Sequence, residues 1–209
     1  MTGVWWEYLA IFSATATVCV VLTPWAMRLA FRRNLLDHPG GHKSHDTAVP
    51  YLGGVSIVAT FSLMVVLISL IWPPHSGLRE LLVVLAMAVF LALVGLADDV
   101  RQVSPLWRIV AEIVAAVAIW SVGTGAIVTA SEPVNMGLTI LWFVGITNAF
   151  NLLDNMDGLA AGLAAIASLT IFAIATTNGQ FLVAGLSVGL AGCTVGFLRH
   201  NFHPARIYM

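Results

Sequence analysis

Residues 148–162 read NAFNLLDNMDGLAAG and lie between two long apolar runs. If this stretch is helical, Asn148, Asn151 and Asn155 share one face, because they lie three and seven positions apart. Polar groups in or beside a bilayer are costly, and a polar stripe at such a place is a functional-site candidate by default. We therefore expect a polar ligand to bind here.

Two carboxylates, Asp154 and Asp157, lie in the same stretch, three residues apart, and Gly158 follows where a helix could end or bend. The simpler alternative is a solvated loop between two membrane helices. Against it, every polar residue from 148 to 157 is an amide or a carboxylate, interleaved with large apolar side chains at helical spacing. We favour a binding site.

The composition is that of a polytopic membrane protein. Of 209 residues, 59% are hydrophobic and 9% charged, and the mean hydropathy is +0.94; soluble domains are about 45–50% apolar and about 25% charged. The net charge of −1 gives no reason to expect a nucleic-acid partner. Cys19 and Cys193 lie in separate apolar runs and suggest neither a disulfide framework nor a metal cluster.

The fold class predicted is all-α: a bundle of about seven transmembrane helices forming one integral membrane domain over residues 1–209. A helix needs about 20 residues to cross the hydrocarbon core. The apolar runs predict helices at about residues 4–29, 53–72, 78–97, 106–127, 136–153, 158–176 and 180–198.

The basic residues predict the orientation. The loops after the first, third, fifth and seventh runs hold all the Lys and Arg residues except Arg79. The positive-inside rule therefore places these loops in the cytoplasm and the N-terminus outside. The unusual polar residues all fall in these loops or beside them, which predicts a single site at the cytoplasmic membrane surface.

Asp98 and Asp99 close the third run. Adjacent carboxylates repel each other unless a cation or proton relieves them, and Mg²⁺ prefers one or two carboxylates together with phosphate oxygens. A solvated helix end is the plainer interpretation, but Asp at a helix C-terminus opposes the macrodipole. Arg101 and Arg108 follow; each could bind a phosphate or simply obey the positive-inside rule.

The first cytoplasmic loop, residues 37–45, reads DHPGGHKSH. Its glycines, Lys43 and His45 could cradle a phosphate, although the pattern is not a P-loop. His42 and His45 alone are a weak signal for a transition metal. Carboxylates, cations and amides together suit phosphoryl transfer, where catalysis is mainly positioning and charge stabilisation.

Four segments resemble the polyprenyl-phosphate N-acetylhexosamine-1-phosphate transferases: residues 37–54, 95–108, 148–162 and 196–209. The resemblance implies a bacterial cytoplasmic-membrane enzyme with its active site facing the cytoplasm. It would need Mg²⁺, with Mn²⁺ as an alternative. The implied reaction joins UDP-N-acetylhexosamine to undecaprenyl or another polyprenyl phosphate and releases UMP, which initiates cell-wall or surface polysaccharide synthesis. The HKSH loop is more similar to the N-acetylglucosamine branch than to the pentapeptide translocases.

The resemblance also implies roles for individual residues. Asp98 and Asp99 match the paired catalytic carboxylates, one of them a candidate base, and with Asp154 they are the implied metal ligands. The implied substrate-binding residues are Lys43, His45, Arg101, Arg108, Asn151, Asp154, Asp157, Asn201 and Tyr208. Among these, Asp157 would lie near the uracil and Tyr208 would stack on it.

Two departures from the family pattern stand out. His42 occupies a position where relatives often carry Arg, which weakens a charge contact. The family continues beyond the position of Met209 with Gly-Asp, whose Asp is a Mg²⁺ ligand, and then with further helices. We therefore expect the chain to be the N-terminal part of a longer transferase, inactive by itself.

Two other functions use acidic residues in a helical membrane protein. A Mg²⁺-dependent membrane prenyltransferase would favour Asp pairs four apart on two helices, whereas these pairs are adjacent and three apart. An ion-coupled transporter would place its acids near the bilayer midplane rather than at one surface. A homodimer is left open by the sequence.

Overall fold

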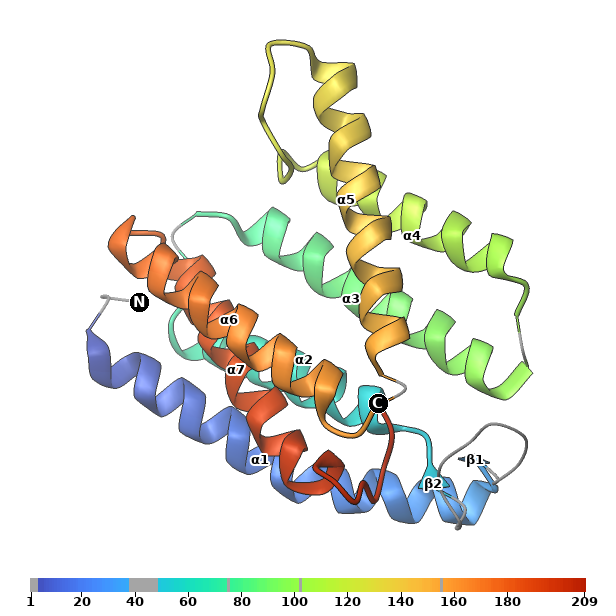
Figure 1. Cartoon of the computed structure of the whole chain (residues 1–209). Coiled ribbons are helices and arrows are strands. Elements are labelled where there is room, and N and C mark those ends of the chain that lie inside the picture. The colour runs from blue at the N-terminus through green and yellow to red at the C-terminus, as the bar shows by residue number, and fades with distance from the viewer. Residues whose placement is uncertain (1–3, 38–48, 75, 102, 155) are drawn as a thin grey trace. The chain divides into compact units, whose positions relative to one another are not determined.

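The computed structural model describes residues 4–37, 49–74, 76–101, 103–154 and 156–209. Lys43 and His45, both predicted to bind substrate, lie outside the described residues. The elements in chain order are α1 (Trp5–Arg33), β1 (Leu36–Asp37), β2 (Val49–Pro50), α2 (Gly53–Ile71), α3 (Leu78–Arg101), α4 (Pro105–Trp120), α5 (Glu132–Leu153), α6 (Leu159–Thr177) and α7 (Phe181–Asn201) (Figure 1). The prediction of an all-α fold is confirmed; β1 and β2 form only a two-residue antiparallel ladder.

Six of the helices are long and apolar enough to cross a membrane, judged by length and composition over the described residues. The chain is a multi-pass membrane protein. The fourth helix differs from expectation, because α4 ends at Trp120 and the chain then turns through Gly123 at a φ of +78°. Its 16 residues extend about 24 Å, less than the roughly 30 Å of a hydrocarbon core.

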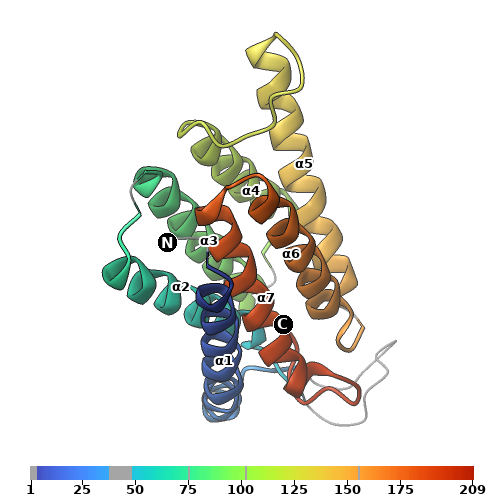
Figure 2. The same ribbon diagram turned by 90° about the vertical axis from the view of Figure 1, so that its left-hand side faces the viewer.

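The chain divides into two compact units, residues 1–74 with 154–209, and residues 75–153. In the first unit α7 packs against α1 and α6, and both views show it beside them (Figures 1 and 2). Small residues permit the close approach: a Cβ added at Gly196 would collide with the backbone of Ala16 on α1.

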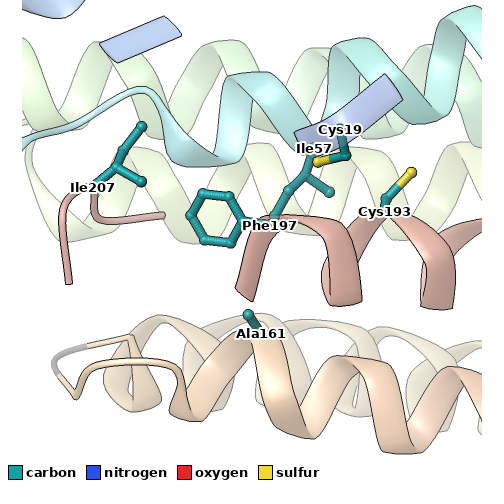
Figure 3. Close-up of a cluster of buried hydrophobic side chains, with 6 residues drawn as sticks. All are labelled: Cys19, Ile57, Ala161, Cys193, Phe197 and Ile207. Atoms are coloured by element: carbon teal, nitrogen blue, oxygen red, sulfur yellow. The ribbon is translucent and has the colours of Figure 1, made fainter. Parts of the chain in front are cut away.

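The core of this unit draws on every one of its helices (Figure 3). The buried cluster consists of Cys19, Ile57, Ala161, Cys193, Phe197 and Ile207. The last of these belongs to the segment after α7, so residues 202–209 are part of the packed fold. Both cysteines are free and fully buried.

The second unit contains α3, α4 and α5, with α4 packed against both neighbours. Helix α3 continues to Arg101 rather than ending before the acidic pair, so Asp98 lies in its final turn. Pro105 begins α4 at the first helical position, where its missing N–H costs no hydrogen bond. This short connection brings the end of α3 and the start of α4 together.

Candidate functional site

The first polar group of the second unit joins α3 to α4. Arg108 Nη1 donates to Asp98 Oδ2 at 3.0 Å. The two side chains are 24% and 22% exposed, so the pair is largely shielded from water. The carboxylate of Asp98 opposes the helix dipole at the end of α3, and the Arg108 guanidinium offsets that unfavourable interaction. The fold therefore holds one predicted catalytic carboxylate against a cation also predicted to bind substrate.

Asp99 and Arg101 occupy the same last turn of α3, and both are exposed. Within the described residues, no three side chains of the types His, Cys, Asp and Glu gather as a metal-binding cluster. Asp98 and Asp99 still fit Mg²⁺, because this ion is usually held by one or two carboxylates while substrate phosphates and water complete its shell.

A second polar group joins α4 to α5. Asn148 Nδ2 donates to Glu112 Oε2 at 2.6 Å and to the Val144 carbonyl at 2.9 Å. Glu112 is only 5% exposed. Sequence reasoning missed Glu112, although a lone acid in the apolar run of residues 105–120 was a readable signal. Asn151 lies one turn beyond Asn148 on α5 and is exposed.

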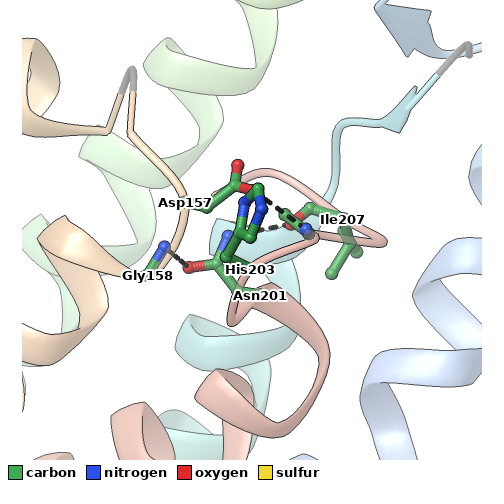
Figure 4. Close-up of polar contacts among 6 residues, drawn as sticks. Asp157, Gly158, Asn201, His203 and Ile207 are labelled. Atoms are coloured by element: carbon green, nitrogen blue, oxygen red, sulfur yellow. Dashed lines mark hydrogen bonds and ion pairs between the residues drawn. The ribbon is translucent and has the colours of Figure 1, made fainter. Parts of the chain in front are cut away.

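The first unit holds the other predicted residues that the structure describes. One of them is Asn201 (Figure 4). Its Oδ1 accepts from the Gly158 N–H at 3.0 Å, and its Nδ2 donates to the Ile207 carbonyl at 2.9 Å. Asn201 is 2% exposed. Gly158 caps the start of α6 with a φ of +70°, a backbone conformation that glycine adopts without strain. Asn201 thus ties the start of α6 to the segment that follows α7.

Asp157 makes a parallel connection to that segment. Its Oδ2 lies 2.9 Å from His203 Nδ1 and accepts from the Ala205 N–H at 3.0 Å (Figure 4). His203 is 81% exposed, whereas the Asp157 side chain is 24% exposed. The carboxylate is therefore fixed by a backbone amide and presented at a partly open surface.

Tyr208 is held through its backbone. Its N–H donates to the Pro50 carbonyl at 3.1 Å, and its carbonyl accepts from the Gly53 N–H at 3.0 Å. Residues 202–209 therefore link the start of α6, the end of α7 and the start of α2. Asp157 and Asn201 both contact this segment, which carries Tyr208. Asp154 lies close to Asp157 in sequence and in the same unit.

A comparison with known proteins matches residues 81–209 to the sequence profile of "Glycosyl transferase family 4". A Bacillus subtilis protein named "Probable undecaprenyl-phosphate N-acetylglucosaminyl 1-phosphate transferase" is 33% identical over 95% of this chain and 56% of its own length. A "Phospho-N-acetylmuramoyl-pentapeptide-transferase" of Bacillus velezensis is 28% identical over 95% of the chain and 67% of its own length.

An "Undecaprenyl-phosphate alpha-N-acetylglucosaminyl 1-phosphate transferase" of Thermotoga maritima is 30% identical over 98% of the chain and 58% of its own length. The chain thus spans somewhat more than half the length of most of the curated relatives it matches. The profile match includes the Asp98–Arg108 pair, the Glu112–Asn148 pair and the whole of residues 154–209.

Proposed function

Because the chain belongs to glycosyl transferase family 4, we propose that it works in a membrane transferase that moves N-acetylhexosamine 1-phosphate from a UDP-sugar to a polyprenyl phosphate. The group expected is N-acetylglucosamine 1-phosphate, in keeping with the names of the Bacillus subtilis and Thermotoga maritima relatives. The observation that carries the proposal is the shielded Asp98–Arg108 pair at the end of a membrane helix, inside the family match.

The reaction exchanges one phosphoanhydride for another. A phosphate oxygen of the lipid attacks the β-phosphorus of the UDP-sugar, and the bond from that phosphorus to the bridging oxygen breaks. UMP leaves with that oxygen, and the product is a polyprenyl-diphospho-sugar. Such transfers depend on alignment and on stabilising charge at the phosphates.

Asp98 and Asp99 are the groups proposed to act at the phosphates. Mg²⁺, or Mn²⁺ in its place, would supply positive charge to the diphosphate when bound to these two carboxylates. For Asp154 the role of metal ligand is proposed from the family resemblance alone. Arg108 orients Asp98 through its 3.0 Å ion pair. Arg101, on the same helix end, is proposed to contact a phosphate of donor or lipid.

The nucleotide-sugar is assigned to the remaining predicted residues. Asn151 and Asp157 are proposed to bind its polar groups, supported by the exposure of Asn151 and the partly open position of Asp157. Tyr208 is proposed to stack on the uracil, and Lys43 and His45 to contact the donor. For Asn201 the burial of its amide favours an indirect role, in which it holds the segment that carries Tyr208.

The proposed location is a bacterial cytoplasmic membrane, with the active site on the cytoplasmic side and the N-terminus outside. The distribution of Lys and Arg supports this orientation. It also fits the substrates, because UDP-sugars are cytoplasmic and the lipid phosphate lies at the membrane surface. The mass of the detergent-solubilised protein tests whether it is a homodimer, which the sequence leaves open.

The experiment uses the complete protein that the gene encodes, purified in detergent with polyprenyl phosphate and Mg²⁺. UDP-N-acetylglucosamine, UDP-N-acetylgalactosamine and UDP-MurNAc-pentapeptide are supplied separately, and UMP is measured. We expect UMP from UDP-N-acetylglucosamine, dependent on both lipid and metal. UMP from the pentapeptide donor alone would overturn the sugar assignment, and no UMP from any donor would overturn the proposed reaction.

The same preparation separates the two rival functions. A prenyltransferase would consume a prenyl diphosphate with an aromatic acceptor and release diphosphate. A transporter would move ions across liposomes without forming UMP.

A further inference from the structure

We propose that Glu112 is a positioning residue that fixes Asn148, and through it the polar face of α5, relative to the Asp98–Arg108 pair. This inference rests on the proposed function, since the positions it controls are those assigned to the transferase site. Glu112 has no role in the chemistry derived above.

Glu112 is a buried acid. Its side chain is 5% exposed in an otherwise apolar helix. A carboxylate taken out of water costs far more than an apolar residue of similar size unless it is hydrogen-bonded. The 2.6 Å contact with Asn148 Nδ2 supplies such a bond, and it is slightly shorter than the ~2.7–3.2 Å typical of N–H···O hydrogen bonds. A buried acid in so apolar a helix of a membrane protein is a candidate functional position.

Two hydrogen bonds fix the orientation of the Asn148 amide. Its nitrogen carries two hydrogens, one directed at Glu112 Oε2 and the other at the Val144 carbonyl. Both partners are acceptors, so the amide cannot be flipped without losing both bonds. The oxygen is then the only atom of the Asn148 amide left to bind a ligand, and it can only accept a hydrogen bond.

The spacing of polar residues along α4 also supports the inference. Arg108 and Glu112 are four apart on α4 and so lie on one face in successive turns. The first holds Asp98 of α3 and the second holds Asn148 of α5. Asn151, proposed to bind the donor, lies one turn beyond Asn148. One face of α4 therefore sets the positions of α3 and α5 where both carry site residues.

The experiment compares Glu112→Gln and Glu112→Ala with wild type in the complete protein. Gln keeps an oxygen that accepts from Asn148, whereas Ala removes it. The matched control is Glu132→Gln, an exposed acid in the first turn of α5. We expect Glu112→Ala to lower kcat by about tenfold or more, because small misplacements of positioned groups cost this much. Glu112→Gln should restore most of the rate, and Glu132→Gln should match wild type.

A double variant separates positioning from general destabilisation. If Glu112 acts through Asn148, then adding Asn148→Ala to Glu112→Ala lowers kcat no further, because the single change has already released the amide. Additive losses, or equal losses for the Gln and Ala variants, would overturn the inference. If wild type itself forms no UMP, the proposed function fails instead, and unfolding of the two Glu112 variants in detergent then tests the contact alone. Equal stability of the Ala and Gln variants in that assay would overturn it as well.

Discussion

At the residue scale, polar side chains in this protein are used in pairs across helices. Asp98 with Arg108 and Glu112 with Asn148 each join two neighbouring helices of one unit. In the other unit Asn201 and Asp157 fasten the start of α6 to the segment after α7. Where water is scarce such groups need protein partners, so each pair satisfies polar atoms and holds in place a side chain to which we assign a role in the proposed reaction.

The Asp98–Arg108 pair predicts a separation of activity from stability. Because the two side chains remain 24% and 22% exposed, water can solvate Asp98 once Arg108 is removed, so Arg108→Ala should lower the free energy of unfolding in detergent by only about 1 kcal/mol. Its effect on transfer should be much larger, about a hundredfold in kcat/KM, because Asp98 loses the cation that orients it. Arg108→Lys keeps the charge and should recover part of the rate. A large loss of stability with unchanged kcat/KM in folded protein would contradict this.

Asn201 predicts the opposite balance. Replacing it with Ala leaves the Gly158 N–H and the Ile207 carbonyl without their partner in a buried place, which should cost about 2 kcal/mol or more. Chemical unfolding of the detergent-solubilised protein measures this loss. Asn178→Ala is the control, since that amide also bonds a helix carbonyl but is exposed at the end of α6. Equal stability of the two variants would contradict a tying role for Asn201.

At the element scale, the contact between α1 and α7 depends on glycine. A methyl group at Gly196 would meet the backbone of Ala16, which cannot move without shifting the helix. We expect Gly196→Ala to destabilise the protein by about 1–3 kcal/mol, the usual cost of overpacking. Gly162→Ala on α6 meets open space and should be neutral or stabilising by about 0.5–1 kcal/mol. Thermal unfolding in one detergent compares them, and equal effects would contradict the close approach.

The sequence predicted the helices well and the contacts poorly. Runs of apolar residues locate helices because hydrocarbon selects for them over about 20 positions. The sequence did not predict the early end of α4 at Trp120. Residues 121–127 are mostly apolar or neutral, so they continue the pattern of the helix, but Gly123 has a positive φ and turns the chain. The extension of α3 to Arg101 was not predicted either, because the apolar run ends at the acidic pair.

The site was predicted as a set of residues rather than as a geometry. The types and spacing of Asp98 and Asp157 indicated a polar site, and the family resemblance implied Asn201. Their partners Arg108, His203, Ala205 and Gly158 lie ten or more residues away, and no local pattern predicts them. Glu112 was missed for the same reason, since its meaning comes from Asn148, 36 residues away. Tertiary contacts of this kind decide which member of a polar pair binds substrate and which one positions it.

At the scale of the whole molecule, the orientation in the membrane is testable because both native cysteines are buried and should not react. Single cysteines at Ser76, Ser104 and Ser131 place a label in three exposed positions. The positive-inside distribution predicts that a membrane-impermeant maleimide labels Ser76→Cys and Ser131→Cys from outside and Ser104→Cys only from the cytoplasm. Labelling of Ser131→Cys from the cytoplasm instead would show that the short α4 does not cross.

As proposed, this family member transfers a phosphosugar rather than a sugar, and following one labelled phosphorus atom tests this reaction most directly. The complete protein is given polyprenyl phosphate, Mg²⁺ and UDP-N-acetylglucosamine labelled at the β-phosphate. Phosphoryl transfer predicts that the label moves to the lipid product and that unlabelled UMP appears in equal amount. Labelled UDP together with an unlabelled glycolipid would mean direct glycosyl transfer, and would contradict the roles proposed for Asp98, Asp99 and Arg108.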